Sequence, residues 1–194
     1  VSTPALALAT SAAAAQGLVF ASNIYEILSP VLPLPGGATV QFHYLDPLDP
    51  TLEPLFRVYK FSPGQGWLLL ADLPPDAIGN TISAPVQTLS LLALMLRDTK
   101  APATALNFMG RRYAAADGRV FGSTSTRFEL LAQDPPLGAF PGTGVALREY
   151  RVDTATGPLA AFSTPFGLEA GFHAIQYRSV DKAGNVEPLK SAAV

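Results

Sequence analysis

The chain lacks cysteine altogether, and it contains few charged residues for its length of 194. The absence of cysteine excludes a thiolate nucleophile, a thiolate metal ligand and a disulfide framework. Charged residues make up 14% of the chain, against about 25% in an ordinary soluble domain. Hydrophobic residues reach 48%, which argues against disorder and predicts additional buried surface, for example against neighbouring copies.

Long apolar runs, strong net charge and a leader segment are also missing. The longest nearly pure apolar run, Leu89 to Leu96, is shorter than the roughly 20 residues that a membrane helix needs, so no membrane span is expected. The net charge of −2 argues against a basic nucleic-acid-binding protein. No initiator Met or basic leader precedes Val1, which we interpret as a processed end, an arbitrary boundary or the edge of a repeat.

The charge is unevenly distributed along the chain. Residues 1–96 contain two basic and six acidic residues, whereas residues 97–194 contain eleven basic and nine acidic residues. An acidic N-terminal half and a mildly basic C-terminal half are suited to head-to-tail attraction between copies. Chance variation between two surfaces explains the same numbers, and we favour that explanation.

Helical periodicity is scarce, and most of the chain alternates with period two or forms short apolar runs between turn residues. In residues 39–44, Val40, Phe42 and Tyr44 share one face, as in a half-buried antiparallel strand. We also expect Tyr59 and Phe61 to face the core. The 14 expected strands are 5–10, 18–28, 38–45, 55–61, 67–70, 81–86, 89–96, 103–108, 119–121, 126–133, 147–152, 159–161, 171–180 and 186–189.

The N-terminus is unusual because its first charged residue is Glu26. We expect this segment to supply a strand to its own domain, or to donate a strand to a neighbour's sheet edge. The best helical candidate, Ala12–Gln16, is interpreted as a strand end or a single turn. The candidate interface residues are Val1, Pro4, Leu6, Leu8 and Phe140.

A short charged stretch with a proline, residues 97–102, follows an apolar strand and marks the expected domain boundary. We therefore predict an N-terminal β-sandwich domain over residues 1–97 and a second β-sandwich domain over residues 98–194. Short strands without βαβ alternation predict an all-β fold of two tandem sandwiches.

Four segments of the second half form a recognisable pattern. The most specific is residues 171–185, Gly-Phe-His-Ala-Ile-Gln-Tyr-Arg-Ser-Val-Asp-Lys-Ala-Gly-Asn, and the others are residues 98–104, 144–153 and 162–166. Through these segments, residues 98–189 resemble the bacterial Ig-like domains that occur as repeats in large secreted and surface proteins. The resemblance implies an Ig-like or fibronectin-like sandwich without catalytic activity. The proline-rich segment 134–143 departs from the family pattern and is a candidate loop for packing on a neighbour.

The first half contains three recognisable pieces: residues 58–60, the Gly66-Trp67 pair and residues 81–90. Through these pieces it is loosely similar to another β-sandwich repeat of bacterial surface proteins. Trp67, the only tryptophan, is expected to anchor a core rather than to form an exposed ligand platform. The two halves share no motif in register.

Chemical motifs are few. The histidines His43 and His173 stand at alternating strand positions, and no nucleophile motif, P-loop or dinucleotide fingerprint accompanies them, so we predict no catalytic residues and no enzyme activity. Calcium binding is the better chemical candidate, and its candidate ligands are Asp46, Asp49, Asp153, Asp181 and Asn185. For Asp181 and Asn185 we favour capping of their turn by side-chain hydrogen bonds, and we expect no cofactor.

These observations favour a structural repeat unit of a secreted bacterial surface protein, fibre or filament. We expect it to be extracellular and to join neighbouring copies or adjacent repeats head to tail, because heterologous contacts that do not close give open assemblies. The alternative is a carbohydrate- or host-surface-binding module of an adhesin or a larger secreted enzyme. For that function, residues 111–113, Arg-Arg-Tyr, form an exposed-looking basic and aromatic spot.

Overall fold

The computed structural model describes residues 3–27, 37–45, 50–88, 90–116 and 120–194, and this part of the chain is predominantly β. Every strand pairing among these residues is antiparallel, which confirms the all-β prediction at this level. Contacts divide the chain into unit 1, Val1–Thr99 with Pro136–Thr143, and unit 2, Lys100–Pro135 with Gly144–Val194. The sequence boundary at 97/98 lies close to the first of three points where the chain passes between units.

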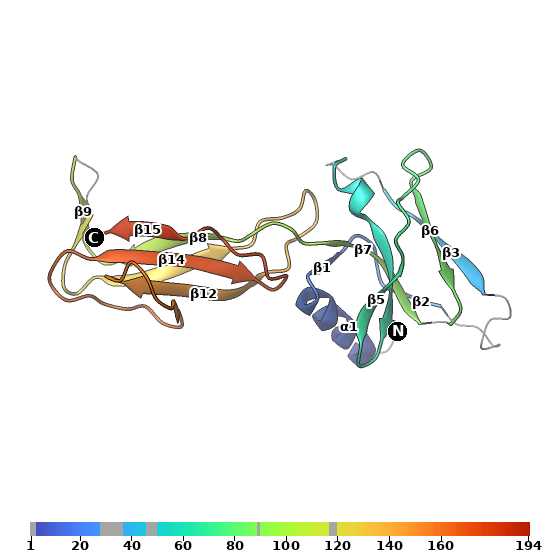
Figure 1. The fold of residues 1–194 in the computed structure, drawn as a ribbon, viewed down its shortest axis with the longest axis horizontal. Coiled ribbons are helices and arrows are strands. Elements are labelled where there is room, and N and C mark those ends of the chain that lie inside the picture. The colour runs from blue at the N-terminus through green and yellow to red at the C-terminus, as the bar shows by residue number, and fades with distance from the viewer. Residues whose placement is uncertain (1–2, 28–36, 46–49, 89, 117–119) are drawn as a thin grey trace. The chain divides into compact units, whose positions relative to one another are not determined.

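Unit 1 contains a five-stranded sheet, a two-stranded sheet and one α-helix (Figure 1). The large sheet has the order β1-β7-β4-β5, with β2 also on β7, and β3 pairs with β6 in the small sheet. The elements are α1 (Thr3–Ala15), β1 (Leu18–Phe20), β2 (Tyr25–Glu26), β3 (Ala38–His43), the 3-10 helix η1 (Glu53–Leu55), β4 (Arg57–Ser62), β5 (Gly66–Ala71), β6 (Thr81–Val86) and β7 (Leu91–Arg97).

Strand β7 is buried on both faces, which explains the apolar run in the sequence. Leu92, Leu94 and Leu96 join one core cluster, which also contains Phe42 and Ile82 of the small sheet. The alternate residues of β7 point the other way, into a second core cluster with residues of α1. Because successive side chains of a strand point to opposite faces, a strand covered on both sides reads as continuously apolar.

The expected strand at residues 5–10 is wrong, because residues 3–15 form helix α1. Seven of its thirteen residues are alanine, the best helix former, and Pro4 stands in the first turn, where proline is tolerated. Ala9 and Ala13 are fully buried, one turn apart, and face the large sheet. Strand donation to a neighbour requires an extended segment, but residues 3–15 form a helix that packs within its own unit.

Trp67 is buried as expected, and it also binds α1. Its indole Nε1–H donates to the carbonyl of Ala9 at 2.7 Å. Its backbone N–H donates to Oε1 of Gln16 at 2.7 Å, and its carbonyl accepts Nε2–H of the same amide at 3.1 Å. These three hydrogen bonds between α1, Gln16 and β5 form what we call the Trp67 clamp.

The segment Pro136–Thr143, which the sequence offered as a loop for packing on a neighbour, belongs to unit 1. Leu137 is 1% exposed and lies in the core cluster between the two sheets. Phe140 packs edge-on against Phe56 with ring centroids 5.7 Å apart, so this candidate interface residue has a partner within its own unit.

Unit 2 contains two principal sheets, β11-β8 and β13-β12-β14-β15, and the hairpin β9-β10. Its core includes Phe128 and Leu130 from the first sheet and Ile175 and Tyr177 from the second, so side chains of two sheets share one core. The strands are β8 (Ala103–Met109), β9 (Arg112–Ala114), β10 (Val120–Gly122), β11 (Arg127–Gln133), β12 (Val145–Val152), β13 (Ala160–Ala161), β14 (Ala174–Asp181) and β15 (Lys190–Ala193).

The last expected strand, residues 186–189, is misplaced, because β15 begins at Lys190. Val186 makes only an isolated bridge to Val180, and Pro188 has no N–H to donate to a neighbouring strand. Among the described helices, none combines the length and the apolarity that crossing a membrane requires.

Candidate functional site

The candidate calcium ligands fall into three groups. Asp46 and Asp49 lie outside the described residues. Asp153 accepts the backbone N–H of Ala174 at 2.8 Å through Oδ1, and its Oδ2 lies 2.6 Å from Nδ1 of His173. Both oxygens of the Asp153 carboxylate therefore have partners within the chain. Calcium binding at Asp153 stays a prediction.

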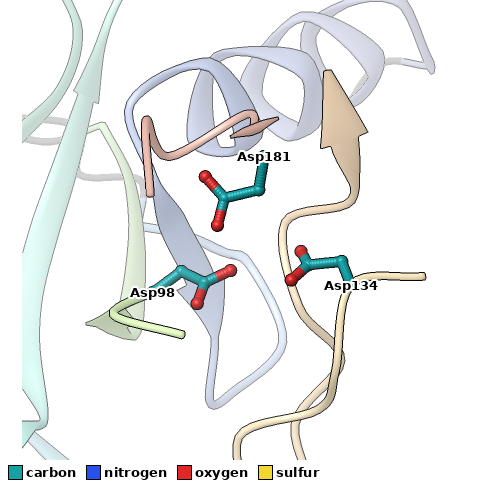
Figure 2. A group of neighbouring side chains, drawn as sticks. All are labelled: Asp98, Asp134 and Asp181. Atoms are coloured by element: carbon teal, nitrogen blue, oxygen red, sulfur yellow. The ribbon is translucent and has the colours of Figure 1, made fainter. Parts of the chain in front are cut away.

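Asp181 and Asn185 cap their turn, as the sequence analysis favoured. Asp181 is 2% exposed, and its two oxygens accept the backbone N–H and the side-chain Nδ2–H of Asn185, both at 2.8 Å. Asp134 lies beside Asp181 in Figure 2, with carboxylate oxygens of the two residues within 4.8 Å of each other. Oδ2 of Asp134 accepts the N–H of Gly144 at 2.6 Å.

Figure 2 also labels Asp98, which belongs to unit 1. There its Oδ2 accepts the backbone N–H of Thr143 at 2.8 Å and the hydroxyl of Thr143 at 2.9 Å. Each of the three labelled aspartates thus accepts hydrogen bonds within its own unit. The sequence analysis had not named Asp98 or Asp134 as candidate ligands.

A buried carboxylate that the sequence analysis missed, Glu187, joins three strands of unit 2. It is 4% exposed and accepts hydrogen bonds from the backbone N–H and hydroxyl of Thr104 on β8, at 2.9 and 2.5 Å. It also accepts the N–H of Ser179 on β14 at 3.1 Å and pairs with Nζ of Lys190 on β15 at 2.6 Å.

The electrostatic balance at Glu187 favours the charged form. Burial raises the pKa of the Glu187 carboxyl, but hydrogen bonds from Lys190 and Thr104 lower it by more, so its pKa lies below the ordinary value. Because β8 belongs to one sheet and β14 and β15 to the other, the charged carboxylate ties the two sheets together. We interpret Glu187 as structural.

His173, which directly precedes β14, and Asp153, which directly follows β12, form a second ionisable pair. Nδ1 of His173 faces Asp153 at 2.6 Å, and its Nε2 lies 3.1 Å from the carbonyl of Glu169. The hydrogen bond to Asp153 raises the pKa of His173, and the Glu169 carbonyl adds to this effect. Both ring nitrogens donate when the ring is protonated, so the arrangement favours a charged histidine over one that acts as a base.

Exposed aromatic rings gather on unit 2, around the hairpin β9-β10. Tyr113 is 67% exposed, Phe121 is 47% exposed, and Phe172, just before β14, is 74% exposed. Rings of Tyr113 and Phe121 are paired across the hairpin, with centroids 6.4 Å apart. We call Tyr113, Phe121 and Phe172 the aromatic patch.

A hollow of about 280 Å³ lies beside the aromatic patch, and Phe121 and Phe172 both line it. The remaining lining residues are small or aliphatic: Val120, Gly171, Ala193 and Val194. A second hollow, of about 170 Å³, shares Gly171 and Val194 with the first and is more polar, with Ser123, Thr124 and His173 in its lining. Single exposed apolar residues are ordinary, but rings gathered at a hollow indicate a binding surface.

The residues predicted from the sequence are only partly at this surface. Arg111, Arg112 and Tyr113 are all exposed, as predicted. Leu6 and Leu8 on α1 are 41% and 54% exposed. Val1 lies outside the described residues, and the side chain of Pro4 is not described either. These candidates stay predictions as interface residues.

Phe172 was missed, although the sequence contains its signal. It shares its alternation with Gln176 and Arg178, whereas Ile175 and Tyr177 on the other alternation are buried. A large aromatic ring among the polar residues of an alternating strand segment is expected to face solvent.

No family model, curated protein or solved structure matches this chain.

Proposed function

We propose that this chain is a structural unit of an extracellular bacterial surface protein, fibre or filament, and that its units join head to tail. The observation that carries the proposal is the aromatic patch with its hollow on unit 2. An apolar surface of this kind is covered in a working assembly, because burying it removes apolar area from water. The resemblance of residues 98–189 to bacterial Ig-like repeats supports the extracellular assignment.

The two units differ in the sign of their net charge, which is compatible with contacts between unlike surfaces. Unit 1 contains three basic and seven acidic residues, a net charge of −4, and unit 2 contains ten basic and eight acidic residues, a net charge of +2. Opposite net charges attract unit 1 of one copy to unit 2 of the next. A contact between two different surfaces does not close on itself by symmetry, so repetition extends the assembly.

Sedimentation velocity over a range of concentrations, followed by electron microscopy, tests the proposal. The wild-type chain is expected to form elongated oligomers at high concentration, and Phe172→Ser is expected to remain monomeric. Leu147→Ser, which changes a 38% exposed leucine on β12, is the matched control and should assemble like wild type. A wild-type chain that stays monomeric at the highest soluble concentration contradicts the proposed function.

The second candidate is a carbohydrate-binding module, and the position of Tyr113 favours it. Its exposed ring stands next to Arg112, and the neighbouring hollow is lined by the hydroxyl residues Ser123 and Thr124. Aromatic faces with a few polar groups nearby are suited to sugar rings, which have apolar faces and hydroxyl edges. Glycan-array binding that Tyr113→Ala abolishes, in a chain that does not assemble, selects this function over the first.

A further inference from the structure

A second exposed feature, on unit 1, matches the hollow on unit 2. Ile78 stands between β5 and β6 and is 99% exposed. Among the large hydrophobic side chains of the described residues, that of Ile78 is the most exposed, and burying such a side chain stabilises by about 1.5–3 kcal/mol. The segment Asp76–Thr81, which we call the Ile78 turn, is therefore a candidate contact site.

The Ile78 turn is held by hydrogen bonds at its base and inside it. The backbone groups of Asp76 and Thr81 bond each other in both directions, at 2.7 and 3.2 Å. Oδ1 of Asp76 accepts the N–H of Ile78 at 3.1 Å and the N–H of Gly79 at 3.3 Å. Asn80 follows with a positive φ of 49°. A turn fixed in this way presents Ile78 with little entropy left to lose on binding.

Size and chemistry match between the Ile78 turn and the hollow lined by Phe121 and Phe172. An apolar cavity of roughly 150 Å³ accepts a benzene-sized guest. The hollow measures about 280 Å³, so it has room for one branched aliphatic side chain. The side chains that line it are aromatic, aliphatic or absent, as at Gly171, which suits an isoleucine side chain.

Charge also matches across the two sites. Asp76 is exposed and stands two residues before Ile78. Arg112 is exposed and lies on β9, next to the residue that pairs with Phe121. An acidic group beside the apolar tip and a basic group beside the hollow favour one orientation of docking.

We propose that Ile78 of one copy inserts into the hollow between Phe121 and Phe172 of a second copy. This inference rests on the proposed head-to-tail function and names the two surfaces that meet. The contact joins unit 1 of one molecule to unit 2 of another, which leaves a free Ile78 turn and a free hollow on the pair. The same contact therefore repeats and extends the assembly.

Cysteine cross-linking tests the contact directly, because the natural chain has no cysteine. Ile78→Cys chains are mixed with Ala193→Cys chains, since Ala193 lines the hollow, and oxidised mildly. The mixed disulfide dimer is expected in excess of both like-with-like dimers, because only close Cβ atoms form the bond readily. The control pairs Leu69→Cys, at a 46% exposed position of β5, with Ala193→Cys. Equal yields in the two mixtures overturn the inference.

Sedimentation velocity separates this inference from the proposed function. Ile78→Ser is expected to weaken self-association at least roughly tenfold. Its fold should be unchanged by circular dichroism and Trp67 emission, because the side chain touches little within its own unit. Arg112→Glu is expected to weaken association at low salt and less so at high salt.

Two outcomes have different meanings. If Ile78→Ser assembles like wild type and Phe172→Ser does not assemble, the Ile78 contact is overturned and the proposed function stands. A wild-type chain that does not assemble at all overturns both.

Discussion

Two ionisable residues of unit 2, Glu187 and His173, have pKa values shifted in opposite directions. The pKa of Glu187 is lowered, so its contribution to stability is present above the ordinary value of about 4.3 and lost as pH falls through the folded-state pKa. The pKa of His173 is raised, so its contribution is present below about 6.5 and lost as pH rises through the folded-state pKa. Both groups favour folding between these two limits.

Glu187→Gln is expected to destabilise unit 2 by about 2 kcal/mol, since hydrogen bonds to a charged group contribute roughly 1.5–3 kcal/mol. An amide also presents N–H groups to the N–H donors of Thr104 or Ser179. Urea unfolding followed by circular dichroism measures the loss, and the difference from wild type should shrink below pH 4. Glu129→Gln is the matched control, because Glu129 is only half-buried and accepts a 3.3 Å hydrogen bond from Asn107. Equal losses in both variants contradict the role given to Glu187.

His173 is expected to titrate above its ordinary pKa of about 6.5 in an NMR titration of its ring protons. Asp153→Asn removes the negative partner of Nδ1 and should return the His173 pKa toward 6.5. An unchanged pKa in that variant means that Asp153 does not cause the shift.

At the scale of elements, the Trp67 clamp explains how an alanine-rich helix is held without large apolar side chains. The buried residues of α1 are small, and Leu6 and Leu8 are exposed, so hydrophobic packing of the helix is modest. The clamp adds hydrogen bonds from the indole and from Gln16. Gly66 is needed beside it, because a Cβ there would lie 2.5 Å from Oε1 of Gln16.

Gly66→Ala is expected to destabilise unit 1 more than Gly64→Ala does. The two glycines have similar φ angles of 80° and 83°, so both variants carry about 1 kcal/mol of backbone strain. Only at Gly66 does the new Cβ displace Gln16, since nothing lies within 4 Å of a Cβ at Gly64. Loss of the Gln16 hydrogen bonds adds about 1–2 kcal/mol. Urea unfolding followed by Trp67 emission measures both variants.

In a Gln16→Ala background, the additional effect of Gly66→Ala should disappear, because no side-chain amide remains to be displaced. Equal effects of the two glycine variants in the natural background contradict the clamp.

At the scale of the whole molecule, unit 1 is completed by the segment Pro136–Thr143, which 36 residues separate from the end of its main part at Thr99. Leu137 and Phe140 of this segment pack among residues of both sheets of unit 1. The folding of unit 1 therefore depends on a chain segment that lies within the second half of the sequence.

Leu137→Ala is expected to lower the stability of unit 1 by about 2–5 kcal/mol, as for other fully buried leucines. The only tryptophan lies in unit 1, so Trp67 emission reports the unfolding of this unit. Leu131→Ala, at a 48% exposed position on β11, is the control and should leave that transition in place. An unchanged Trp67 transition in Leu137→Ala means that the segment is not part of the folded core of unit 1.

Much of the strand pattern was predictable because it is local. The alternation of Val40, Phe42 and Tyr44 against exposed Thr39 and Gln41 is present in β3 and in Tyr44, which directly follows it. The expected strand at residues 81–86 coincides with β6. In both strands one face is buried and the other is exposed to solvent, so apolar and polar residues alternate along the sequence.

The N-terminal segment was misread because its pattern is weak. Alanines and leucines fill residues 5–9 without charged positions to mark a solvent face. The helix is specified by intrinsic propensity and by a sheet surface formed by residues far along the chain, and a period-two reading detects neither.

By itself, the sequence determined the all-β class, the strands with a clear alternation and the burial of Trp67, because each depends on residues close together in the chain. The tertiary structure alone decided that α1 packs on the large sheet, that Leu137 completes unit 1 and that Glu187 is buried. It also brought Phe121 and Phe172 to one hollow, although 50 residues separate them. Such features depend on contacts between distant segments, which form only when the chain packs and which no local pattern records.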